Sequence, residues 1–188
     1  MKRTRAVAIT ATCLLLLASP AGCGSKARQY ASQARASYVS ARAVLVGVQE
    51  FPSQIEELLR SEDLNVLAED ARKIIEDARN LLPSATSAFR AVKEKSEQLR
   101  GEGSDKFGPY AEDLLELVAL NEQVINAYSE FIGLTSSALQ GLPYTQDPQK
   151  LVPTVYYMDS TIAGIEELMG QIRRLESEAE ALYQEITR

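Results

Sequence analysis

The stretch YAEDLLELVALNEQVINAYSEF, from Tyr110 to Phe131, decides the fold class of this chain. Its apolar residues recur at alternating intervals of three and four, which places them on one face of an α-helix. A β-strand requires a strict alternation of apolar and polar residues instead, and the chain has no such alternation of useful length. The helical spacing runs through Tyr110, Leu114, Leu117, Asn121, Val124, Tyr128, Phe131, Thr135, Ala138 and Leu142.

Three other runs in the chain have the same spacing. The first is Ala27, Tyr30, Ala34, Ser37, Ala41, Val44, Val48, Phe51, Ile55 and Leu58. The second is Leu64, Leu67, Ala71, Ile74, Ala78, Leu81, Ala85, Ala88, Val92, Lys95 and Leu99. The last is a column of Leu151, Met158, Ile165, Ile172, Ala179 and Ile186, flanked by Leu168, Leu175 and Leu182. The sequence therefore predicts an all-α protein with helices over 26–60, 62–100, 105–140 and 148–187. Four helices of similar length joined by short loops bury every apolar stripe in an up-down-up-down antiparallel four-helix bundle.

Proline and glycine residues set the expected ends and irregularities of these helices. Pro52 and Pro83 fall inside helical runs whose phase continues past them, so we expect kinks there, and we expect a break near Pro153. A separate short helix over 53–60 is an open alternative at Pro52, because Ser53 and Glu56 have the spacing of a capping box. Pro109 and Pro148 suit early helical positions, and Gly141 suits the end of a helix.

The N-terminal residues form a targeting pattern rather than part of the bundle. Three of the first five residues are basic, 6–18 are apolar, and small or turn-forming residues 19–22 precede Cys23. This pattern resembles a bacterial lipoprotein signal peptide, and Ala21-Gly22-Cys23 match the end of a lipobox, although Pro20 stands where the pattern has an aliphatic residue. The resemblance implies that 1–22 are removed and that Cys23 carries lipid such as palmitate. It leaves 23–188 as a single domain anchored to the extracytoplasmic face of a bacterial cell membrane.

Ordinary secretion is the competing interpretation of the same residues. A peptidase cut after 19–21 would give a secreted or periplasmic soluble protein whose Cys23 is a lone free thiol. The helix after Cys23 has basic residues and no acidic residue before Glu50. These cations either contact anionic lipid headgroups or belong to a solvated helix face, and the sequence leaves both possibilities open.

Composition narrows the classes of function. The 188 residues have a formal net charge of −6 and no histidine. Such an acidic chain without a dense basic stripe is not expected to bind nucleic acid. The lack of histidine, and of cysteine after Cys23, excludes Ser-His-Asp and Cys-His catalysis, histidine-ligated haem and zinc clusters. Adjacent acidic pairs such as Glu56-Glu57 and Glu166-Glu167 diverge by about 100° on a helix and predict solvated faces. We therefore expect no catalytic residues, no metal and no cofactor.

Five polar residues interrupt the predicted apolar stripes: Ser37, Lys95, Asn121, Thr135 and Glu176. An asparagine in a helical core often fixes the register of neighbouring helices, which is one role for Asn121. The other is to line a small ligand cavity together with Thr135 and the ring of Tyr128. Lys95 and Glu176 are expected near bundle ends, where long side chains reach water.

The segment LQGLPYTQDPQKLVPTVYY, 139–157, combines three prolines with Tyr144, Tyr156 and Tyr157. In an up-down bundle this connection lies at the end far from Cys23. The tyrosines there either anchor a protein partner or close the end of the bundle.

These observations favour a non-enzymatic interaction or structural protein of the bacterial cell envelope, held to the membrane by lipid on Cys23 and bound to a protein partner. The alternative is a bundle that binds a small ligand or a cell-wall fragment, in the core or at the membrane-distal end. A cavity of a few hundred Å³ lined by the polar stripe residues would favour ligand binding.

Overall fold

The computed structural model describes residues 23–59, 64–102, 105–141 and 152–188. These residues form the helices α1 (Cys23–Gln49), α2 (Phe51–Leu59), α3 (Leu64–Gly101), α4 (Gly108–Gly141) and α5 (Val152–Thr187). There is no β-strand within these ranges, and the predicted all-α class is confirmed. None of the described helices is both long enough and apolar enough to cross a membrane.

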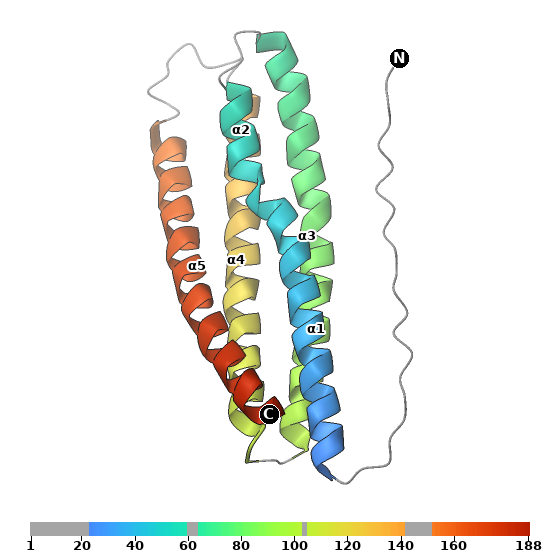
Figure 1. Ribbon diagram of the computed structural model, residues 1–188. Helices are drawn as coiled ribbons and strands as arrows, with labels where there is room; N and C mark the ends of the chain where they lie inside the picture. Colours follow the sequence, from blue (N-terminus) through green and yellow to red (C-terminus); the bar gives the residue numbers. More distant parts are fainter. Residues whose placement is uncertain (1–22, 60–63, 103–104, 142–151) are drawn as a thin grey trace, which may run out of the picture.

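The helices are arranged as a bundle (Figure 1). α3 packs along α1 on one side and along α4 on the other, and α5 packs along α4. α2 continues the path of α1 beside α3. The start of α1 and the end of α5 lie at the same end of the bundle, which we call the Cys23 end, and α5 begins toward the opposite end. α1 and α5 do not approach each other as closely as the packed pairs do.

The break between α1 and α2 falls at Glu50, two residues before Pro52. Pro52 has no N–H to donate, so the helical hydrogen bonds are interrupted at this point. The bonds on either side persist, since Glu50 N donates to Val46 O at 3.2 Å and Gln54 N donates to Glu50 O at 3.0 Å. The chain bends here and resumes the helix at Phe51, not at Ser53 as the alternative prediction had it (Figure 1).

The other helix-end predictions have mixed outcomes. Pro83 lies inside one continuous helix, α3. Pro109 is the second residue of α4 and Gly141 is its last residue, as expected. Pro153 is the second residue of α5, and the predicted helix start at Pro148 lies outside the described residues.

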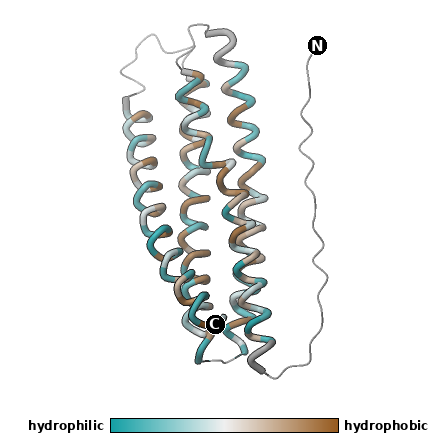
Figure 2. The backbone as a smooth tube through the Cα atoms, in the orientation of Figure 1, coloured by the Kyte–Doolittle hydropathy of each residue, from teal (hydrophilic) through white to brown (hydrophobic). Residues whose placement is uncertain are grey.

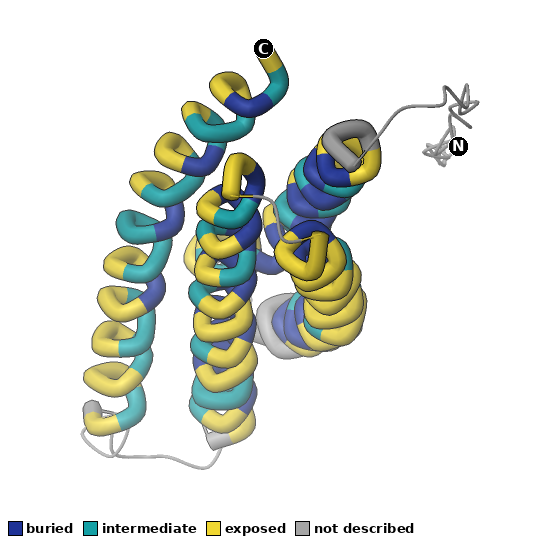
Figure 3. The backbone as a smooth tube through the Cα atoms, turned by 90° about the horizontal axis from the view of Figure 1, so that it is seen from below, coloured by how far each residue is buried: buried dark blue, intermediate teal, exposed yellow. Residues whose placement is uncertain are grey.

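The core lies between the facing sides of the helices, with hydrophilic residues on the outer sides (Figures 2 and 3). α1 contributes mainly small residues to the main cluster, which lets it pack close against α3: Ala27, Ala31, Ala34 and Ala41 are fully buried. A second cluster lies around the bend, where the rings of Phe51 and Phe131 meet edge to face with centroids 5.7 Å apart.

The predicted core positions are right on most of α4 and α5, where Ala138 and Met158 are only half-buried, and they are displaced by one residue on parts of α1 and α3. Ile165, Ile172, Ala179 and Ile186 of the predicted α5 column are buried. On α1 and α3 the half-buried residues are Tyr30, Ser37, Val44, Ile74, Ala88 and Lys95, and the next residue in each case is buried: Ala31, Tyr38, Leu45, Ile75, Phe89 and Ser96. A helix face that contacts two neighbouring helices includes the residues three and four positions after each core residue. On α1 and α3, which pack closely together, the residue four positions on is the buried one.

Candidate functional site

A pocket with a volume of about 240 Å³ opens where α1 and α5 face each other across α4. α1 contributes Arg35, Tyr38 and Val39, α4 contributes Tyr110, Leu114 and Leu117, and α5 contributes Glu176, Ala179 and Glu180. The buried leucines and Ala179 make an apolar floor, while charged side chains stand at the rim. We call the line along which these α1 and α5 side chains meet the α1–α5 seam.

On its outer side the seam is closed by a bidentate ion pair between Arg35 and Glu180. Arg35 Nε donates to Glu180 Oε2 at 2.9 Å and Nη2 donates to Oε1 at 3.1 Å. The Arg35 guanidinium also lies 4.9 Å from the centre of the Tyr183 ring. The hydrogen bonds from Arg35 lower the pKa of Glu180, and those to Glu180 raise the pKa of Arg35. Both side chains are about two-fifths exposed, so water screens this pair.

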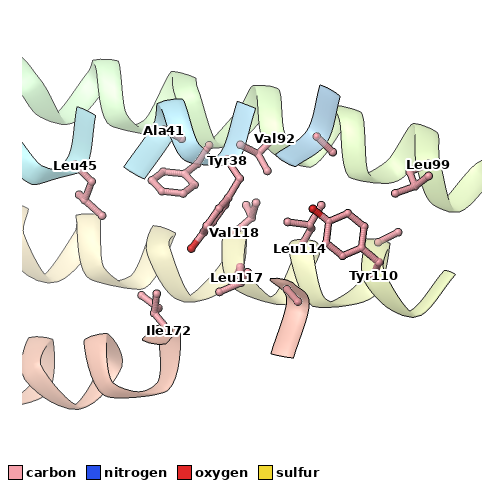
Figure 4. Packing of buried hydrophobic residues seen from close by; sticks show 14 of the residues in the cluster. Tyr38, Ala41, Leu45, Val92, Leu99, Tyr110, Leu114, Leu117, Val118 and Ile172 are labelled. Carbon is pink, nitrogen blue, oxygen red and sulfur yellow. The ribbon is translucent and has the colours of Figure 1, made fainter. Parts of the chain in front are cut away.

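Glu176 lies one helical turn before Glu180 on α5, and it accepts hydrogen bonds from two residues of α1. Tyr38 Oη donates to Glu176 Oε1 at 2.7 Å, and Arg42 Nε donates to the same oxygen at 2.9 Å. Figure 4 shows the Tyr38 side chain pointing from α1 into the space beside Leu117. Burial and the hydrogen bond to Glu176 raise the pKa of Tyr38 well above its usual range, so its hydroxyl is protonated and serves as a donor.

Asn121 of α4 extends this polar group into the core, where it is fully buried. Its Nδ2 donates to Leu117 O at 2.7 Å and to Tyr38 Oη at 3.4 Å, and its Oδ1 accepts from Arg42 Nη1 at 3.3 Å. All the polar atoms of this amide therefore have protein partners. This arrangement suits the predicted register role, because the asparagine links α4 to α1 at one level of the bundle.

Tyr110 sits at the other end of the pocket and is 2% exposed. Its ring contacts that of Tyr183 at 5.4 Å between centroids. Burial, with a further contribution from Tyr183, raises the pKa of the Tyr110 hydroxyl above its usual range. Within the described ranges, the hydroxyl has no hydrogen-bond partner.

The remaining predicted site residues lie apart from this pocket. Thr135 is buried, but it lies about 21 Å from Asn121 along α4 at 1.5 Å per residue. Its Oγ1 donates to Phe131 O at 2.8 Å, so the structure does not bring Asn121 and Thr135 into one cavity. Tyr156 and Tyr157 are exposed at 71% and 60%, with ring centroids 6.2 Å apart. Tyr144 lies outside the described residues.

Sequence reasoning missed most of the seam. From the sequence, Arg35 and Arg42 belong to the basic residues after Cys23, which are expected either to contact lipid headgroups or to lie on a solvated helix face, and Glu180 has no predicted role. The available signal was spacing, since Arg35 and Arg42 are seven residues apart and Glu176 and Glu180 four apart, each pair on one helix face. Lys95 was expected to reach water and does so, with its Nζ donating to Gln98 Oε1 at 3.3 Å. Glu176 instead joins two helices.

No group of three or more carboxylate or thiol side chains is placed to hold a metal ion within the part of the chain that the structure describes. No family model matches this chain, and neither the curated proteins nor the solved structures that we compared with it give a match.

Proposed function

We propose that this chain is an up-down-up-down antiparallel bundle, anchored by lipid at Cys23 to the extracytoplasmic face of a bacterial membrane, that acts as a non-enzymatic interaction protein of the cell envelope. The signal-peptide resemblance of 1–23 supports the placement. The course of the helices in Figure 1, with α1 starting and α5 ending at the Cys23 end, supports the antiparallel arrangement.

An exposed aromatic surface at the start of α5 carries the interaction role. Val155, Tyr156 and Tyr157 are all at least half exposed, and we call them the α5 tyrosine patch. The patch lies toward the end of the bundle opposite Cys23. Large aromatic side chains left open to solvent together are typical of contact sites for other proteins, because burying them on binding is favourable. With the lipid anchor at the Cys23 end, the α5 tyrosine patch would lie far from the membrane, where a partner can reach it.

The hydrogen bonding of the two buried polar residues Asn121 and Thr135 supports this role over ligand binding inside the core. Asn121 and Thr135, which would have lined a core cavity, have their polar atoms bonded within the protein. Neither lines the pocket at the seam.

The anchor is tested by mass spectrometry of the protein made in a bacterial host. We expect the wild-type protein in the membrane fraction, starting at Cys23 and carrying acyl mass on that residue. Cys23→Ser should lack the acyl mass. Cys13→Ser is the matched control, because residue 13 is removed with the leader and the mature product should be unchanged. An intact leader or a bare thiol on the wild-type protein would rule out the anchor.

The partner role is tested by photo-crosslinking in living cells. A photoreactive amino acid replaces Tyr156, and in a control it replaces Arg174, an exposed residue of the same helix. We expect a discrete adduct with one envelope protein from position 156 only, weakened by Tyr157→Ser. The same set of adducts from both positions, or none from position 156, would argue against the tyrosine patch as a docking surface.

A further inference from the structure

We propose that the pocket at the α1–α5 seam is a binding site for a small amphipathic ammonium compound of about eight to ten non-hydrogen atoms. The size follows from the volume of about 240 Å³, since liquid water occupies about 30 Å³ per molecule. This site is separate from the tyrosine patch, and the inference does not rest on the proposed envelope role.

The Tyr110 hydroxyl is the observation that points to a ligand. Tyr110 is 98% removed from solvent, and its hydroxyl has no partner among the described residues. Every fully buried side-chain nitrogen or oxygen atom in that part of the chain does have a hydrogen-bond partner. The Tyr110 oxygen is therefore not sealed in the core, and the pocket is the open space that this residue lines. Figure 4 shows the ring lying along α4 beside Leu114. A protonated phenol in this position offers a hydrogen bond to an acceptor on a ligand.

The carboxylates of α5 set the charge of the ligand. Both oxygens of Glu180 accept from Arg35, and Glu176 Oε1 accepts from Tyr38 and Arg42. Glu176 Oε2 accepts no hydrogen bond from another described residue, which leaves it open to a donor in the pocket. The charges around the pocket are balanced, because Arg35 pairs with Glu180 and Arg42, from outside the lining, pairs with Glu176. The acceptor oxygen Glu176 Oε2 is therefore what favours a ligand with a hydrogen-bond donor, and an ammonium group is the strongest donor for a carboxylate.

The floor of the pocket sets the body of the ligand. Leu114, Leu117 and Ala179 are buried side chains without polar atoms, and they line the pocket together with Tyr110 and Glu176. A flat or aliphatic group placed on this floor would remove apolar surface from water. The pocket thus matches an ammonium group at Glu176, an apolar middle and a hydrogen-bond acceptor at Tyr110.

Tyramine is the probe, because it has an ammonium group, an aromatic ring and a hydroxyl oxygen. Titration of the purified intact protein, followed by the NMR signals of backbone amides, should show saturable shifts at pocket residues and a dissociation constant in the millimolar range, as for other ligands of this size. Phenethylamine, which lacks the hydroxyl, and 4-ethylphenol, which lacks the ammonium, should each bind more weakly. 3-(4-Hydroxyphenyl)propionate, with a carboxylate in place of the ammonium, should bind most weakly.

Two variants with matched controls locate the site. Tyr110→Phe should weaken tyramine about threefold to tenfold and leave phenethylamine unchanged, because it removes one neutral hydrogen bond. Glu176→Gln should weaken both amines by about tenfold and leave 4-ethylphenol unchanged. The controls are Tyr128→Phe, a buried tyrosine of α4 away from the pocket, and Glu178→Gln, an exposed carboxylate of α5. Circular dichroism confirms that each variant is folded.

Three results would overturn the proposal. The first is the absence of saturable shifts at the pocket with tyramine. The second is equal weakening by the control variants. The third is tighter binding of the carboxylate than of the amine, which would show that the assigned charge is wrong.

Discussion

Arg35 and Glu180 join the first and last helices through two parallel hydrogen bonds, 145 residues apart in the chain. With Tyr38, Arg42 and Glu176 they hold α5 against α1 by long polar side chains. The other helix pairs of the bundle are held mainly by apolar packing.

The Arg35–Glu180 pair should add little to stability at neutral pH and less in acid. In a double-mutant cycle with Arg35→Ala and Glu180→Ala, we expect a coupling free energy of about 0.5 kcal/mol, because both side chains are partly exposed. The folded state lowers the pKa of Glu180. Its contribution is therefore present above the unfolded pKa of about 4.3 and is lost as the pH falls through the folded pKa. Urea unfolding at pH 7 and pH 3 measures the change, and coupling that is larger at pH 3 would show that the sign is wrong.

Asn121 should be costly to truncate and much less costly to replace with an apolar residue. Asn121→Ala removes buried hydrogen bonds and leaves a cavity, so we expect the free energy of unfolding to fall by about 2 kcal/mol. Asn121→Leu fills the space, and Arg42 and Tyr38 keep their bonds to Glu176, so the loss should be about 1 kcal/mol or less.

The control for this pair is Asn126→Ala, at an exposed position of the same helix, which should change stability by less than about 0.5 kcal/mol. Chemical denaturation measures all three variants. An Asn121→Ala variant as stable as this control would mean that the buried amide has no structural role.

Asp113 is a residue whose charge should cost stability. Desolvation raises its pKa, and the nearby carboxylates Glu178, Glu116 and Glu112 raise it further. A raised folded-state pKa means that the carboxyl favours folding in its protonated form and opposes it once ionised in the folded state. Asp113→Asn should therefore increase stability at pH 7 by up to about 0.5 kcal/mol, and the gain should disappear in acid.

Thermal unfolding at pH 7 and pH 3 tests this effect. Glu122→Gln, an exposed carboxylate of the same helix, serves as the control and should show a smaller change. A stabilisation by Asp113→Asn that persists at pH 3 would have to come from something other than charge.

Close packing of α1 on α3 makes the small residues of α1 intolerant of enlargement. Ala34 is fully buried, whereas Ala36, two residues along the same helix, is exposed. Ala34→Leu should lower the free energy of unfolding by about 1–3 kcal/mol through overpacking. Ala36→Leu should change it by less than about 0.5 kcal/mol. If urea unfolding gives equal effects for the two, α1 does not pack on α3 by this face.

Periodicity was enough to predict the class of the fold and much of its core. The column from Ile165 to Ile186 on α5 is buried as expected, because residues seven apart return to nearly the same side of a helix. Pro109 and Gly141 marked the ends of α4, since each fits a helix terminus for a local reason.

The seam was not predictable in the same way. Spacing shows that Arg35 and Arg42 share a face of α1, but it does not show which helix that face meets. That depends on how α1, α4 and α5 are placed around one another, which arises from contacts between distant parts of the chain. The buried position on α1 is Tyr38 and not the predicted Ser37 for the same reason, because the placement of the neighbouring helices determines which of two adjacent residues is covered.

The long sequence separation of the seam has a consequence for folding order. Contacts of α1 with α3 need only the first half of the chain, whereas Glu176 and Glu180 reach α1 after nearly all of it is in place. Bringing residues so far apart in the chain together is slow and costs entropy. The hydrogen bonds that form at the seam are partly hydrated, so they offset little of this cost. The seam between α1 and α5 should therefore close last, as the latest and most easily reversed step of assembly.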